Sequence, residues 1–131
     1  MQAVIEYSQL TKELMTKYLR QFLLIDCECF TPYWNAENFL VDFPEKWDKS
    51  QAAFSNGLLV GYLIVSLKND HYHVHRIAVH PHYRNRGIGR WLMKHLSNYT
   101  AQVYDIEAAG FWVALGCKVM AIHENKHPAT S

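Results

Sequence analysis

The chain has 131 residues, of which 50% are hydrophobic and 19% are charged, so it is long enough to bury one continuous core. Its formal net charge of +1 excludes an overall basic field of the kind that binds nucleic acid or an anionic membrane surface. No apolar run approaches the roughly 20 residues that cross a bilayer, and the first residues lack the layout of a signal peptide. We therefore expect one domain over residues 1–131, located in the cytoplasm, with no nucleic-acid or membrane partner.

The first third of the chain predicts a strand followed by two helices. Residues 2–7 form a short strand candidate, and Ser8 or Thr11 can cap the helix that follows. That helix carries apolar side chains at the spacing of a core face: Leu14, Met15, Tyr18, Leu19, Phe22 and Leu23. A second, short helix is expected over residues 36–41, between loops that contain prolines, aromatic residues and acids.

The middle of the chain predicts three successive antiparallel strands. Asn56-Gly57 separates two β-rich runs, and this dipeptide favours the positive φ angles of a type I′ turn. A second turn at Asn69-Asp70 leads into a strand from His71 to Val79. The sheet therefore begins as a meander of antiparallel strands.

Helices and strands alternate in the last third of the chain. We expect helices at about 88–97 and 108–115 and strands at about 101–106 and 117–122. The element order is then βα(α)βββαβαβ, which predicts an α/β (α+β) fold: a mixed, mostly antiparallel sheet with helices on both faces and a short C-terminus.

A basic turn with two glycines, Gly87 and Gly89, joins the strand ending at Val79 to the next helix. Amide groups at the start of a helix attract anions, and glycine allows a phosphate to come close to the backbone. The dinucleotide fingerprint fails because Leu92 stands where its third small residue belongs, and the Gly-Lys-Ser/Thr ending of a P-loop is absent. The turn predicts a phosphate site of another kind.

The sequence Arg84-Asn85-Arg86-Gly87-Ile88-Gly89, preceded by the strand HRIAVHPHY, resembles the pyrophosphate loop of the GNAT superfamily of acyl-CoA-dependent N-acetyltransferases. A fainter match, DIEAAGFWVALGC, departs from the family pattern at Asp105, Trp112 and Cys117. The resemblance implies a GNAT-like fold and acetyl-CoA as cosubstrate. It also implies the cofactor-binding residues, which are Ile77, Ala78, Val79, Arg84, Asn85, Arg86, Gly87, Ile88, Gly89 and Arg90.

The same resemblance implies that the pantetheine arm bonds to the backbone of Ile77 and Val79, with the Ile77 amide facing the thioester oxygen. The family often carries a glutamate base six residues before the valine that ends this strand, and His73 stands there. Strand alternation puts His71, His73 and His75 on the face of Ile77 and Val79. Either His73 or His75 acts as the base, or the row only packs. A metal site is disfavoured because same-face neighbours lie ~7 Å apart.

We therefore expect direct acetyl transfer from acetyl-CoA to a small-molecule or protein amine, with no metal. The alternative is a CoA-binding module with little catalysis, because the indole of Trp112 cannot protonate the departing thiolate as the family's tyrosine does. Tyr104 or a water could replace that tyrosine. The short C-terminus leaves the last hairpin strand to a partner subunit, as in a homodimer, or leaves one wall of the acceptor site open. Three acids could attract an ammonium group or merely face water: Glu28, Glu37 and Asp42.

The cysteine content agrees with an intracellular enzyme. Cys27, Cys29 and Cys117 form an odd, sparse set, which fits a reducing compartment better than a disulfide framework. We expect these three residues to be free thiols without a catalytic role.

Overall fold

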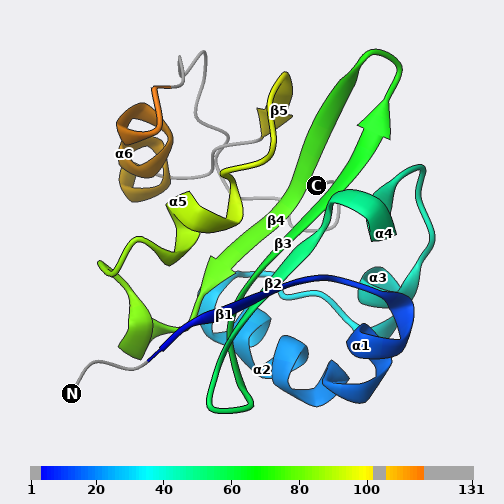
Figure 1. The fold of residues 1–131 in the computed structure, drawn as a ribbon, viewed down its shortest axis with the longest axis vertical. Coiled ribbons are helices and arrows are strands. Elements are labelled where there is room, and N and C mark those ends of the chain that lie inside the picture. Colours follow the sequence, from blue (N-terminus) through cyan, green and yellow to red (C-terminus); the bar gives the residue numbers. More distant parts are fainter. Residues whose placement is uncertain (1–3, 102–105, 117–131) are drawn as a thin grey trace. The chain divides into compact units, whose positions relative to one another are not determined.

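The computed structural model describes residues 4–101 and 106–116 (Figure 1). The chain forms two compact units, residues 1–100 and 101–131. In chain order the elements are β1 (Glu6–Gln9), α1 (Lys12–Lys17), α2 (Leu19–Cys29), α3 (Ala36–Leu40), α4 (Lys46–Lys49), β2 (Gln51–Ser55), β3 (Leu58–Lys68), β4 (His71–Val79), the 3₁₀ helix η1 (Pro81–Tyr83), α5 (Ile88–Leu92), β5 (Tyr99–Ala101) and α6 (Ile106–Ala114).

The sheet has five strands in the order β1-β2-β3-β4-β5, and β1 to β4 pair as antiparallel neighbours. Both predicted hairpin turns are present: Asn56 and Gly57 have φ of 50° and 79°, and Asn69 has φ of 57°. Asparagine and glycine tolerate this left-handed region better than other residues do. The mostly antiparallel sheet expected from the sequence is confirmed.

Helices cover both faces of the sheet, as predicted. Phe22 of α2 packs on Tyr62 of β3 with ring centroids 5.2 Å apart. On the other face, α5 lies against Gly61, where an added Cβ would come within 3.2 Å of Ile88 Cγ2 and 3.1 Å of the Ala78 carbonyl oxygen. Residues 61 and 62 are neighbours on one strand, so their side chains point to opposite faces. A glycine at position 61 therefore allows α5 to approach the strands closely.

The helices differ from the sequence prediction in their limits. Thr11 caps α1 by accepting a hydrogen bond from the Leu14 amide at 3.1 Å, but the expected single helix is interrupted at Tyr18. The short helix α4 was not predicted. Helix α5 ends at Leu92 rather than near residue 97, because the next amides bond three residues back, as in Lys94 N–H to Trp91 O at 3.1 Å.

The C-terminal elements are described only in part. Strand β5 begins at Tyr99, two residues before the expected start, and α6 spans Ile106–Ala114. Tyr104 and the strand expected over residues 117–122 lie outside the described residues. Among the helices that the structure describes, none is long and apolar enough to span a bilayer.

Candidate active site

Strand β4 contains a β-bulge at His75. Ile64 pairs with Arg76, and the next pair along the two strands is Val65 with Val74, so His75 is the inserted residue without a counterpart on β3. An inserted residue reverses the faces that the remaining side chains occupy. The faces predicted from the sequence require unbroken alternation along this strand.

The bulge places His73 and Ile77 on opposite faces of the sheet. Ser66 pairs with His73, and Leu63 pairs with Ile77. Ser66 and Leu63 are three residues apart on β3, and strand side chains alternate, so the two pairs face opposite ways. The prediction that His73 shares a face with Ile77 and Val79 is therefore wrong, because a period of two cannot represent an inserted residue.

His75 is in contact with three side chains: Ser66, Phe43 and His73. Its Nε2 lies 2.7 Å from the Ser66 hydroxyl oxygen, and its ring stacks on Phe43 with centroids 5.1 Å apart and planes 13° apart. The ring of His73 meets it edge-on at 4.8 Å, and His73 Nδ1 lies 3.3 Å from the Thr100 hydroxyl oxygen. Two of the three histidines in the predicted row thus form one cluster with polar partners.

The surroundings of this histidine cluster favour uncharged imidazoles. Burial, with smaller contributions from His73, Lys68 and Lys46, lowers the pKa of His75 to about 4. Burial also lowers the pKa of His73, and Lys68 and His71 add to that effect. Both rings are therefore mostly neutral at pH 7, and His75, with a pKa of about 4, is a weak proton acceptor.

A buried polar cluster, which the sequence analysis missed, joins β4 to the loop after α2. Asp26 is fully buried, accepts a hydrogen bond from the Tyr62 hydroxyl and pairs with Arg76 Nε at 3.3 Å. Arg76 Nη2 donates to the Pro32 carbonyl at 3.0 Å, and the guanidinium lies 4.0 Å from the centre of the Phe30 ring. Arg76 thus fixes the loop after α2 against the histidine face of β4. Only the isolated acid and base were visible in the sequence, 50 residues apart.

The turn after β4 has the backbone that its glycines predict. Asn85 and Gly87 both lie in the left-handed region, with φ of 62° and 80°. A Cβ added to Gly87 would meet nothing within 4 Å. The protein itself leaves this space open, so a close approach of a ligand to the backbone is sterically allowed at Gly87. The residues present therefore fit a pyrophosphate group.

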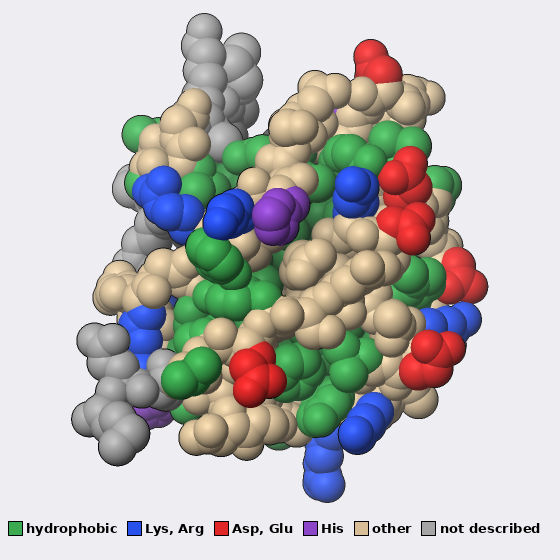
Figure 2. Space-filling view, in the orientation of Figure 1, with side chains coloured by type: hydrophobic (Ala, Val, Ile, Leu, Met, Phe, Trp, Pro, Cys, Tyr) green, Lys and Arg blue, Asp and Glu red, His purple; other side chains and the backbone are tan. Residues whose placement is uncertain are grey.

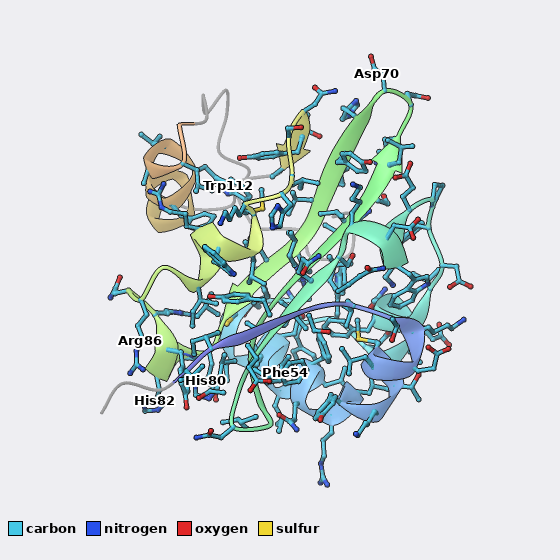
Figure 3. All side chains as sticks on the ribbon, in the orientation of Figure 1. Phe54, Asp70, His80, His82, Arg86 and Trp112 are labelled. Atoms are coloured by element: carbon cyan, nitrogen blue, oxygen red, sulfur yellow. The ribbon has the colours of Figure 1, made fainter. Side chains whose placement is uncertain are left out.

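Two of the turn's arginines bond to the chain itself. Arg84 donates from Nε to the Val79 carbonyl at 3.1 Å and from Nη2 to the Cys29 sulfur at 3.2 Å. Arg86 donates to the His82 carbonyl at 3.2 Å, and Figure 3 shows Arg86 and His82 together at this end of the hairpin, opposite Asp70. Arg84 thereby connects the end of β4 with the end of α2.

Three other predicted cofactor-binding residues are buried. Ile88 and Gly89 are buried in α5, and Ala78 is buried on β4. Trp112 is buried on α6, as expected of a core residue. Among the described residues, no group of three or more His, Cys, Asp and Glu side chains is arranged to hold a metal ion.

Charge is distributed unevenly on the face shown in Figure 2. Most acidic side chains lie over the edge that carries α1, α3 and α4, where Lys and Arg side chains also lie, whereas over α5 and the turn before it the charged side chains are Lys, Arg and His. Asp42 on the acidic edge pairs with Lys12 at 3.3 Å and accepts a hydrogen bond from Trp47 Nε1 at 2.8 Å. One of the acids considered for attracting an ammonium group is therefore already engaged.

The bulged strand and the glycine turn lie in a part of the chain that matches a known family. The acetyltransferase (GNAT) family matches residues 13–122. The chain belongs to the GNAT family. The matched residues include β4, the turn and α6. Among curated proteins, no sequence relative reaches significance.

Solved GNAT N-acetyltransferases share the fold. Ard1 from Thermoplasma volcanium is 18% identical with a TM-score of 0.73, over 89% of this chain and 84% of that one. Arabidopsis thaliana Naa50, bound to the bisubstrate analogue CoA-Ac-MVNAL, is 17% identical with a TM-score of 0.70, over 89% and 85%. The Escherichia coli ribosomal-protein-S18-alanine N-acetyltransferase is 22% identical with a TM-score of 0.65, over 86% and 74%.

Proposed function

We propose that the chain transfers an acetyl group from acetyl-CoA to a primary amine, by direct attack of the amine in a ternary complex. The observation that carries this proposal is the unit formed by the bulged β4, the glycine turn and α5 in a chain of the GNAT family. Naa50 was solved with a bisubstrate CoA analogue and a Thermoplasma acidophilum GNAT protein with coenzyme A. These complexes support the proposal that this chain binds acetyl-CoA.

The glycine turn is the proposed site of the pyrophosphate. Gly87 leaves room beside the backbone, and arginines surround the turn. The family resemblance supports backbone bonding of the pantetheine arm at residues 77–79. Acetyl-CoA supplies an activated acyl group, and the Ile77 amide is the proposed donor to the oxygen on which charge develops, which is typically worth about 3 kcal/mol.

His73 is the proposed general base. Its lowered pKa keeps the imidazole neutral at pH 7, so that it can take the proton that the attacking amine loses. His75 is less suited to this role, because its Nε2 already lies 2.7 Å from the Ser66 hydroxyl and its pKa is about 4. The two histidines that the sequence left as equal candidates are thus given different roles.

The buried Trp112 favours a second candidate, a CoA-binding module with little turnover, because no tyrosine stands at that position. Release of free thiol from acetyl-CoA, measured with a panel of small amines and N-terminal peptides, separates the two. Thiol release that depends on the amine supports the transferase. Saturable binding of acetyl-CoA, without thiol release above the rate without amine, supports the binding module.

The acceptor class, assembly and location remain proposals. The solved neighbours include a ribosomal-protein acetyltransferase and an aminoglycoside acetyltransferase, so both protein and small-molecule amines belong in the panel. A homodimer that completes the sheet and a cytoplasmic location are further expectations, which size measurement in solution and cell fractionation would test.

A further inference from the structure

The segment between α3 and α4 is fixed against the edge of β3. Lys46 is fully buried, and its Nζ donates to the Phe39 carbonyl at 2.5 Å and the Val41 carbonyl at 2.6 Å. The Pro44 carbonyl accepts a hydrogen bond from the Leu67 amide at 2.8 Å. Phe43 lies between these anchors, so its position is set by the backbone on both sides.

In this position, the ring of Phe43 stacks on the imidazole of His75. The two rings are nearly parallel, with planes 13° apart and centroids 5.1 Å apart. Phe43 itself is 40% exposed, which means that its outer side meets water while its inner side covers the imidazole. An exposed aromatic ring stabilises the fold less than a buried one, so its packing energy alone is a weak reason for a phenylalanine at position 43.

A charge on His75 would act directly on His73. The two rings are in edge contact at 4.8 Å, and like charges at this distance repel strongly in a partly buried site. The other groups that lower the two pKa values are basic as well: Lys68 of β3, Lys46 of α4 and His71 of β4. Among the described residues, no acid contributes to the charge state of either histidine.

We propose that Phe43 is a positioning residue that, together with Ser66, keeps His75 covered and uncharged, so that His75 orients His73 without competing with it for the proton. The proposal rests on the proposed function, in which His73 is the base. Ser66 contributes the hydrogen bond to His75 Nε2, and Phe43 covers one face of the ring. The low pKa of His75 agrees with this arrangement.

The test is the pH dependence of kcat/KM between pH 5 and 8.5. In the wild-type protein, the acid side should show one ionisation, that of His73. In Phe43→Ala the pKa of His75 should rise toward the ordinary value of about 6.5, although His73, Lys68 and Lys46 still hold it below that value, so that the acid side shows two ionisations. Phe43→Tyr keeps the stacked ring and should restore the wild-type profile.

Val41→Ala is the matched control, because Val41 lies in the same segment, is 41% exposed and has no part in the ring contacts and hydrogen bonds described above for the two histidines. It should keep a single ionisation whatever its effect on kcat. NMR titration of His75 provides a second readout that does not need turnover. If Phe43→Ala leaves both the profile and the His75 titration unchanged in an active enzyme, the proposal is overturned while the proposed function stands. If the wild-type protein acetylates no amine, both fail.

Discussion

Substitution of Gly87 separates the cofactor role of the turn from its role in the fold, because the chain contains a matched glycine. Gly87 in the turn and Gly57 in the β2–β3 hairpin have φ of 80° and 79°, and a Cβ added at either position meets nothing within 4 Å. Alanine at each position therefore incurs the same backbone strain, about 1–2 kcal/mol, partly offset by the reduced entropy of the unfolded chain. Both variants should lose a few degrees of Tm.

Only Gly87→Ala should weaken acetyl-CoA binding. If a methyl group enters the space of the pyrophosphate and weakens binding tenfold, the loss is about 1.4 kcal/mol. A ligand concentration of 100 times the wild-type Kd stabilises the wild-type protein by about 2.7 kcal/mol, but the variant, then at 10 times its own Kd, by only about 1.4 kcal/mol. The rise in Tm with acetyl-CoA should therefore be about halved.

The assay is thermal unfolding at increasing acetyl-CoA concentration, with each variant compared with its own ligand-free Tm. Gly57→Ala should show the full wild-type rise from a lower starting Tm. Equal ligand-induced rises in the two variants would refute the assignment of this turn to the pyrophosphate.

Three further outcomes are expected. Lys46→Met removes the donor to two backbone carbonyls, one of them buried, and should lower the free energy of unfolding by about 2–4 kcal/mol in urea titration; a loss below 1 kcal/mol would contradict this reading. The pKa of His75 falls from 6.5 to about 4 on folding, so its contribution to stability is complete above pH 6.5 and is lost as the pH falls toward 4. His75→Gln should therefore reduce the loss of stability between pH 7 and 4.5 by up to about 2 kcal/mol, and His82→Gln is the control. Equal losses of stability in the wild-type protein and in His75→Gln would exclude the titration of His75 as the cause. Trp112→Phe should lower stability but leave kcat within about tenfold of the wild-type value, or ~1.4 kcal/mol. A larger fall in kcat, measured at a temperature well below the variant's Tm, would mean that the indole takes part in catalysis.

Local signals in the sequence predicted local structure well. Asn56-Gly57 determines its turn through its own φ preferences, and the glycines after β4 do the same, so neither depends on distant residues. Their positions, and with them the strand order β2-β3-β4, could be predicted directly.

Features that depend on partners far along the chain could not be predicted in this way. The bulge at His75 is visible only against the pairing partner β3, and it changed the face assigned to His73. The ion pair of Arg76 with Asp26 joins residues 50 apart in the sequence, and nothing near either residue indicates the other. Phe43 reaches His75 because buried Lys46 fixes the segment, although lysine usually indicates surface.

Because α5 approaches Gly61 closely, a residue of β3 that lies outside the family motif affects the position of the turn. Gly61 lies 26 residues before Gly87, yet a methyl group there would be 3.2 Å from Ile88, the first residue of α5. The Ala78 carbonyl and the Ile88 side chain would have to give way by a few tenths of an ångström, and a shift of the helix to relieve the contact would move the end of the turn with it. Affinity for an acyl-CoA could then diverge between related chains whose Arg-x-x-Gly-x-Gly sequences are identical, through substitution at a strand position that no ligand touches.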